Sequence, residues 1–340
     1  MQRELTIREA IAEALSEEME RDENVILIGE DIDIPNGFGG PFGVTLGFAE
    51  KFGEERVLNT PISEAAIVGC AIGASISGLR PVAEVQYADF LFCAADQIVN
   101  QMAKLRYMSG GQVTLPLVLR APVGATGRGA QHAQSPEAFF INVPGLKIVA
   151  PSSSYDAKGL LKTAIRDNDP VLFFEHKLLY GTKGVREEKG AWRTTSYVPK
   201  KEYLIPLGKA EIKREGKDVT VVATLLMVHK TLLAAQKLSE EGISLEVIDP
   251  RSLVPLDKET IINSVKKTGR LAIVEESPQR GGIGAEIAAI IAEEASDYLD
   301  APIKRIASFN VPIPAAPILE NFVVPGLERI RKEIKKLIRG

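Results

Sequence analysis

Short apolar runs alternate with amphipathic stretches along the first half of the chain. Apolar residues recur at helical spacing over 64–77, 89–108 and 154–167. Strands that alternate with helices in this way form parallel sheets whose two faces are both covered, so the first half is predicted to be an α/β domain. The runs predicted as its buried strands are 25–29, 81–86, 115–121, 146–150 and 171–175.

The alternation stops between 176 and 205, where Lys, Gly, Glu and Thr dominate, and then starts again. The chain is therefore predicted to contain two α/β domains, 1–185 and 209–340, joined by a linker at 186–208. The second domain is predicted to contain strands at 219–224, 245–249, 271–275 and 302–307, and helices at 228–240, 258–267, 285–299 and 325–338.

Composition excludes several classes of protein. Hydrophobic residues make up 45% of the chain and charged residues 25%, which is typical of a globular protein with a sizeable core. A formal net charge of −4 argues against nucleic acid as the main partner. No apolar run reaches the ~18 residues of a membrane span, and residues 1–19 lack the apolar centre of a signal peptide, so we expect a cytoplasmic protein without a membrane partner.

The two cysteines, Cys70 and Cys93, lie in apolar surroundings. Two such residues give neither a disulfide framework nor a cysteine-ligated metal site, and they are predicted to be buried free thiols. At the N-terminus, Thr6 and Glu9 have the spacing of a capping box and predict a helix that begins there. The loop 34–43 contains two prolines and four glycines, a composition found both in functional loops and in simple surface connections.

The segment Thr60-Pro61-Ile62-Ser63-Glu64 delivers a carboxylate to the first turn of a predicted helix that is rich in Gly and Ala. Such a glutamate can simply complement the positive end of the helix. The next predicted strand ends in a segment that contains Gln86 and Phe90, and ligands of parallel sheets bind at the carboxyl ends of strands. A third candidate, His132, follows another strand in the glycine-rich segment 124–134.

Together these motifs resemble thiamine-diphosphate enzymes, and in particular the beta subunits of pyruvate, branched-chain 2-oxo acid and acetoin dehydrogenases, over nearly the whole chain. The resemblance implies a transketolase-like pyrimidine-binding domain followed by a transketolase C-terminal-like domain. It implies that Glu64 hydrogen-bonds N1′ of the cofactor's aminopyrimidine ring and favours the imino tautomer, which deprotonates the thiazolium carbon. It also implies that the Ile62 carbonyl binds the amino group, with Gln86 and Phe90 beside the ring.

For His132 the resemblance implies proton transfer or charge stabilisation during decarboxylation or acyl transfer. Ala133 stands where serine is frequent in the family. The turn after the helix 154–167 resembles a structural site for a monovalent cation such as K⁺, although a plain Asp/Asn/Pro turn has the same sequence. Its ligands would be the carbonyls of Leu117, Ala164, Ile165 and Asp167 and the side chain of Asp169.

The chain contains no Gly-Asp-Gly motif, which in these enzymes anchors the cofactor's pyrophosphate through Mg²⁺. The resemblance therefore implies an alpha subunit that binds the Mg²⁺, an alpha2-beta2 heterotetramer with a shared cofactor, and acyl transfer to lipoyl-lysine on an acyltransferase core. Pyruvate or acetoin is favoured as the substrate over a branched-chain 2-oxo acid. Two alternatives stay open: the C-terminal half of a split transketolase, and a subunit without catalytic residues that only binds a partner.

Overall fold

The computed structural model describes residues 3–34, 38–181 and 194–339. These form two compact units. The first contains most of the chain up to Leu207, and the second contains the chain from Gly208 onward together with the segment Gly124–Ala138. The first eight residues of the predicted linker, 186–193, lie outside the described residues.

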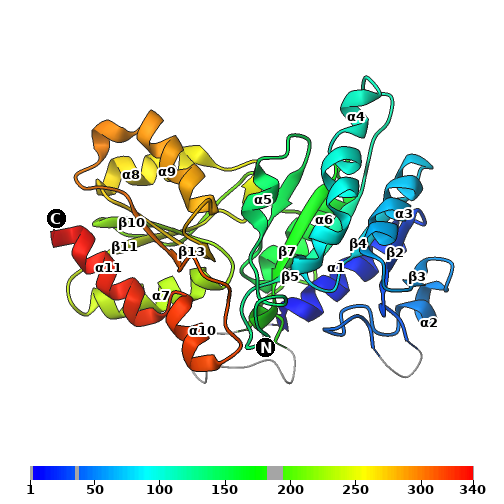
Figure 1. Ribbon diagram of the computed structural model, residues 1–340, viewed down its shortest axis with the longest axis horizontal. Helices are drawn as coiled ribbons and strands as arrows, with labels where there is room; N and C mark the ends of the chain where they lie inside the picture. The colour runs from blue at the N-terminus through cyan, green and yellow to red at the C-terminus, as the bar shows by residue number, and fades with distance from the viewer. Residues whose placement is uncertain (1–2, 35–37, 182–193, 340) are drawn as a thin grey trace. The chain divides into compact units, whose positions relative to one another are not determined.

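A parallel sheet forms the centre of the first unit (Figure 1). Its strands follow the order β3-β2-β4-β5-β7-β6, and every neighbouring pair in this order is parallel. The α/β prediction is therefore confirmed for this unit, and the carboxyl ends of its strands meet at one edge, where ligands of such sheets bind. The strands are β2 (Val25–Glu30), β3 (Val57–Thr60), β4 (Arg80–Glu84), β5 (Val118–Val123), β6 (Lys147–Val149) and β7 (Val171–His176).

Helices accompany these strands as the apolar periodicity predicts. Helix α1 (Ile7–Arg21) begins at the predicted capping box, in which Thr6 and Glu9 bond reciprocally. Helix α6 (Ser154–Arg166) packs against α1, and α3 (Glu64–Ile76) packs against β4. This unit also contains α2 (Phe48–Phe52), the 3₁₀ turn η3 (Lys177–Leu179) and the antiparallel pair β1 (Glu4–Thr6) and β8 (Thr195–Tyr197). The short helix α5 (Glu137–Ile141) begins in the second unit and ends in the first.

The predicted helix at 89–108 is not one regular helix. It is divided into a 3₁₀ segment η1 (Ala88–Ala94), a π-helical segment η2 (Gln97–Met102) and a short α-helix α4 (Leu105–Met108). Apolar spacing shows which side chains are buried, but it does not distinguish hydrogen bonds to the third, fourth or fifth residue along the chain. The prediction of continuous α-helix was therefore wrong here, although the segment is helical.

The second unit also has a central sheet, with the order β14-β13-β10-β11-β9. The pairs among β14, β13, β10 and β11 are parallel, whereas β9 is antiparallel to β11. The strands are β9 (Glu211–Arg214), β10 (Val219–Ala223), β11 (Leu245–Asp249), β13 (Leu271–Pro278) and β14 (Lys304–Ser308), with a short β12 (Ser252–Val254). The helices are α7 (Leu226–Ser239), α8 (Lys258–Thr268), α9 (Ile283–Glu294), a 3₁₀ turn η4 (Ser296–Tyr298), α10 (Pro317–Val323) and α11 (Leu327–Arg339).

The prediction of buried thiols was wrong, because Cys70 and Cys93 are both free and exposed in this chain. Cys70 lies on the side of α3 that also exposes Ala66 and Gly73, away from the buried Ile67 and Val68. Apolar neighbours in the sequence were therefore not enough to predict burial, because they do not determine on which side of the helix Cys70 lies. Among the described residues, no helix is long and apolar enough to cross a membrane.

Candidate active site

Glu64 lies in the first turn of α3, and Ile62, in the loop before it, is 76% exposed. The N-cap residue Ser63 makes no side-chain capping bond. Within the described part of the chain, the Glu64 carboxylate makes no hydrogen bond and no ion pair. The positive helix end favours its negative charge, while both oxygens remain available to a ligand.

A second carboxylate, Glu30, stands at the end of β2, near enough to Glu64 for the two negative charges to repel each other. Burial raises the pKa of Glu30 above its usual range, and the negative charges of Asp31 and Glu64 raise it further. Gln86, just after β4, donates from Nε2 to the Glu30 carbonyl at 3.5 Å. The sequence analysis did not single out Glu30, although an acidic pair directly after a buried strand was a visible signal.

Aromatic rings lie beside these polar groups. Phe90, in η1, is half-buried and packs edge-on against Tyr87, with 5.8 Å between ring centroids. Phe42 packs edge-on against Tyr87 and stacks on Tyr180 at 4.7 Å. The buried Lys177 places Nζ 5.0 Å from the centroid of Tyr87. The first unit therefore combines carboxylate, amide and aromatic groups, a set that fits a flat nitrogen heterocycle such as an aminopyrimidine.

A buried ion network lies beneath this edge of the sheet. Arg120 in β5 donates from NH1 to Glu84 at 2.5 Å and binds Glu175 through Nε and NH2 at 2.7 and 2.8 Å. Burial alone would lower the pKa of Arg120, but the two carboxylates outweigh burial and raise it. Burial raises the pKa of Glu84, and Glu175 adds to that effect. The network ties the carboxyl ends of β4 and β7 to β5, and so fixes the strand end that precedes Gln86.

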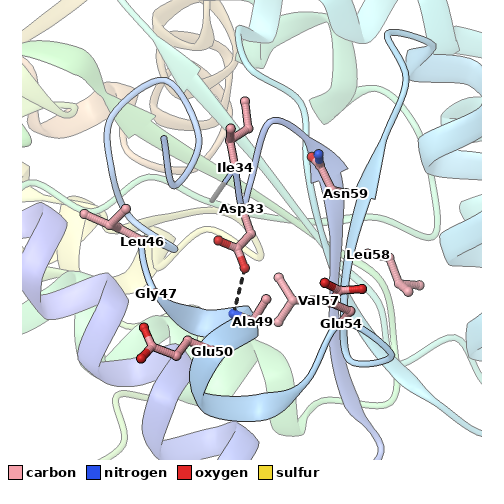
Figure 2. A pocket seen from close by; sticks show the side chains of 10 residues that line it. All are labelled: Asp33, Ile34, Leu46, Gly47, Ala49, Glu50, Glu54, Val57, Leu58 and Asn59. Carbon is pink, nitrogen blue, oxygen red and sulfur yellow. Dashed lines mark hydrogen bonds between the residues drawn. The ribbon is translucent and has the colours of Figure 1, made fainter. Parts of the chain in front are cut away.

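A cavity of about 890 Å³ lies beside β3, between α2 and the segment that follows β2 (Figure 2). Asp33 accepts a hydrogen bond from the Ala49 backbone at 2.9 Å on its wall. Of its lining residues, Asn59 is the nearest in sequence to Ile62 and Glu64. The cavity is therefore distinct from the group of Glu64, Glu30 and Gln86. Its lining consists of Asp33, Ile34, Leu46, Gly47, Ala49, Glu50, Glu54, Val57, Leu58 and Asn59.

His132 is half-buried and belongs to the second unit, through the segment Gly124–Ala138. Its backbone N–H donates to the Gly129 carbonyl at 3.2 Å, which closes a turn. The structure thus brings Glu64 and Gln86 together around Glu30 within one unit, and it holds His132 in the other. Of the remaining histidines, His176 is fully buried, and its Nδ1 accepts a hydrogen bond from the Leu178 backbone.

The oxygens predicted to bind a monovalent cation already have protein partners. Arg80 donates to the carbonyls of Ile165 and Asp167 at 2.9 and 2.7 Å. Asp169 pairs with Arg106 and with Lys147. Burial would raise the pKa of Asp169, but these two cations outweigh burial and lower it.

The other two predicted ligands, the carbonyls of Leu117 and Ala164, accept backbone hydrogen bonds from Val171 and Asp167. Each of these four carbonyl oxygens has a second lone pair that a cation could use, so the monovalent-cation site stays a prediction, and no step below uses it. Within the described residues, no group of three or more His, Cys, Asp or Glu side chains could hold a metal ion.

Comparison with known families defines the class of this protein. Residues 3–183 match the family described as "Transketolase, pyrimidine binding domain", and residues 208–330 match "Transketolase, C-terminal domain". The fold and the matched families together define a transketolase-like protein of the thiamine-diphosphate-dependent class. A solved structure titled "Split gene transketolase, inactive beta4 tetramer" superposes with a TM-score of 0.79 at 25% identity, covering 98% of this chain and 99% of that one.

Curated relatives define the family more narrowly. The 2-oxoisovalerate dehydrogenase subunit beta of Bacillus subtilis (strain 168) is 48% identical over 97% of both chains. The acetoin:2,6-dichlorophenolindophenol oxidoreductase subunit beta of the same organism is 47% identical over 97% of this chain and 96% of its own. The mitochondrial pyruvate dehydrogenase E1 component subunit beta-2 of Oryza sativa subsp. japonica is 48% identical over 98% of this chain and 86% of its own. The chain belongs to this family of beta subunits of 2-oxo acid and acetoin dehydrogenases, which are oxidoreductases that work with an alpha subunit.

Proposed function

We propose that this beta subunit supplies the aminopyrimidine-binding half of a thiamine-diphosphate site in a pyruvate or acetoin dehydrogenase. The observation that carries the proposal is Glu64, whose carboxylate has no protein partner among the described residues and lies with Glu30 and Gln86 at the carboxyl edge of a parallel sheet. The carboxylate is half-exposed at the positive end of α3, so it is available to hydrogen-bond a ligand that reaches this edge.

Each residue then has a specific task. Glu64 hydrogen-bonds ring nitrogen N1′ and holds a proton there, and the exposed Ile62 offers its backbone carbonyl to the amino group. Phe90 and Gln86 fix the plane of the ring. His132 transfers a proton or stabilises charge during decarboxylation or acyl transfer. When bound, thiamine diphosphate supplies the nucleophilic carbon that attacks the 2-oxo group.

The rest of the site is proposed to come from other chains. The absent Gly-Asp-Gly motif assigns the pyrophosphate and its Mg²⁺ to the alpha subunit, in an alpha2-beta2 heterotetramer whose product passes to a lipoyl-bearing acyltransferase core. Within this chain, the proposed domains are 1–185 and 209–340, joined at 186–208. A cytoplasmic location is proposed because several of its relatives are bacterial.

Two other functions have specific support. The 48% identity to a 2-oxoisovalerate dehydrogenase subunit favours a branched-chain 2-oxo acid. The likeness to a split transketolase over nearly the whole of both chains favours transketolase chemistry. Each of these functions would use Glu64 against the aminopyrimidine in the same way, so substrate assays must distinguish them.

The test is co-expression with an alpha subunit of this family from the same organism, followed by assays with thiamine diphosphate, Mg²⁺ and an artificial electron acceptor. Pyruvate, acetoin and 3-methyl-2-oxobutanoate are compared, together with a ketose phosphate as the transketolase substrate. We expect turnover of pyruvate or acetoin that requires both chains. Turnover by the beta chain alone, or turnover of the ketose phosphate only, would contradict the proposal.

A further inference from the structure

The loop that carries His132 is fastened by two carboxylates from distant parts of the chain. The backbone N–H of Ala125 donates to Oε1 of Glu276, in β13. The backbone N–H of Gly127 donates to Oε2 of Glu320, in α10, at 2.6 Å. Glu276 and Glu320 are only 7% and 5% exposed, so both carboxylates are buried where they meet the loop.

Three glycines give the backbone of this loop wide conformational freedom. Gly124, Gly127 and Gly129 adopt φ values of +95°, +75° and +80°, in the left-handed region that glycine occupies readily. The base of the loop is closed by one bond, from the Gly124 N–H to the Gln134 carbonyl at 3.1 Å. Glycine residues give the unfolded and open states of a loop many conformations. A loop that contains three glycines therefore needs contacts with other segments to keep a single conformation.

The proline-rich segment that precedes α10 provides the surface on which the loop lies. A Cβ atom added at Gly129 would come within 3.5 Å of the Ala315 Cβ, and one added at Gly127 within 3.9 Å of the Ala315 carbonyl oxygen. The Pro residues around Ala315 stiffen this segment. The loop therefore lies against a stiff proline-rich segment and is hydrogen-bonded to α10, the helix that follows this segment.

We propose that Glu276 and Glu320 are positioning residues, which hold the His132 loop in the conformation that the reaction uses. The inference rests on the proposed function of His132 and adds the two carboxylates that hold the loop around it in place. A bond from a backbone N–H to a carboxylate is about twice as strong as one to a neutral acceptor, which suits a loop that must not move. A displacement of about 1 Å at a catalytic group can reduce the rate about a hundredfold.

The variants are Glu320→Ala, which removes the acceptor, and Glu320→Gln, which retains an oxygen at the same distance along the side chain. If the alanine variant does not fold, Glu320→Asp keeps the charge and withdraws the acceptor by one methylene. Asp257→Ala is the matched control. Asp257 is 7% exposed and accepts the backbone N–H of Ala210 at 3.1 Å in the same unit, but it does not contact the loop.

The first readout is tryptic cleavage of the full-length chain after Arg128, an exposed residue of the loop, with the fragments identified by mass spectrometry. We expect Glu320→Ala to accelerate this cleavage about 10- to 100-fold, because a charge-assisted hydrogen bond and a buried partner are lost. Glu320→Gln should restore most of the protection. Asp257→Ala should lower the melting temperature without accelerating cleavage after Arg128.

The second readout is steady-state kinetics of the assembled enzyme. We expect Glu320→Ala to lower kcat at least tenfold with little change in the KM of the 2-oxo acid, and Glu320→Gln to rescue it. Unchanged cleavage after Arg128 in Glu320→Ala would overturn the proposal, and so would faster cleavage with unchanged kcat. If the wild-type assembly has no activity at all, the proposed function fails, while the cleavage readout still decides whether Glu320 holds the loop.

Discussion

Glu137 gives the structure a pH dependence that can be predicted in magnitude. This carboxyl group opens α5 and is only 6% exposed. Burial raises its pKa from an ordinary 4.5 to about 8, and the negative charges of Glu276 and Glu275 add to the shift. The folded chain therefore retains a proton on Glu137 at neutral pH, whereas the unfolded chain releases it.

The sign and size follow from proton linkage. A folded-state pKa above the unfolded value gives stability that is fully present below pH 4.5 and is lost as the pH rises to about 8. Each unit of pH in that window costs about 1.4 kcal/mol. Between pH 6 and pH 8 the wild-type chain should therefore lose about 2 kcal/mol through this single group, because half of the folded molecules are already ionised at pH 8.

Glu137→Gln keeps the shape of the neutral acid and removes the titration. Its stability relative to wild type should rise by about 3 kcal/mol between pH 6 and pH 9, or roughly 5 °C in melting temperature. The measurement is thermal melting of both chains at pH 6, 7, 8 and 9 in buffers of equal ionic strength. A melting-temperature difference that does not change over this range would refute the account of Glu137 as a buried neutral acid.

Three other predictions concern stability and reactivity. Gly40→Ala should destabilise the chain by about 1–3 kcal/mol in thermal melting, because φ is +74° and the added Cβ would meet Oε1 of Glu84. Gly47→Ala, with φ +79° and open space around it, should cost about 1 kcal/mol, and equal losses in the two variants would contradict this reasoning. Cys70 and Cys93 should both react with a thiol reagent in the native isolated chain, and protection of either one would show that it is buried after all. Replacing K⁺ by choline at constant ionic strength tests the predicted ion site: an occupied site should make the melting temperature fall by several degrees, and an unchanged melting temperature would contradict that site.

Regular elements with many apolar residues were predictable from the sequence. The strand at 245–249 has the predicted bounds, and the helix at 258–267 differs by one residue. β3 was not predicted, because it has four residues and exposes Asn59. α10 was not predicted either, since it is short and its exposed Ile318, Leu319 and Phe322 give no buried stripe.

For the candidate site, local sequence motifs indicated which residues would contact a ligand. They did not predict contacts between residues that are far apart in the sequence. Glu64, Gln86 and Phe90 were singled out through the resemblance to thiamine-diphosphate enzymes, and in the structure Glu64 follows β3 while Gln86 and Phe90 follow β4. Glu276 and Glu320 reach their partners across 151 and 193 residues of sequence, and no periodicity records such a pairing. The turn that carries Asp167 was recognised from the sequence as polar. Its partners Arg80 and Lys147 could not be predicted, because they come from distant strands.

The most direct test of the central claim compares Glu64→Gln with Glu23→Gln, an exposed glutamate outside the site, in the assembled enzyme. The measurement is the rate of 2-oxo acid decarboxylation at saturating thiamine diphosphate and Mg²⁺. The account predicts a fall of at least a hundredfold for Glu64→Gln, because one general acid–base group contributes about 10²–10⁴ in rate, and no change for Glu23→Gln. Full activity in a correctly assembled Glu64→Gln enzyme would contradict the assignment of the pyrimidine-binding site to this chain.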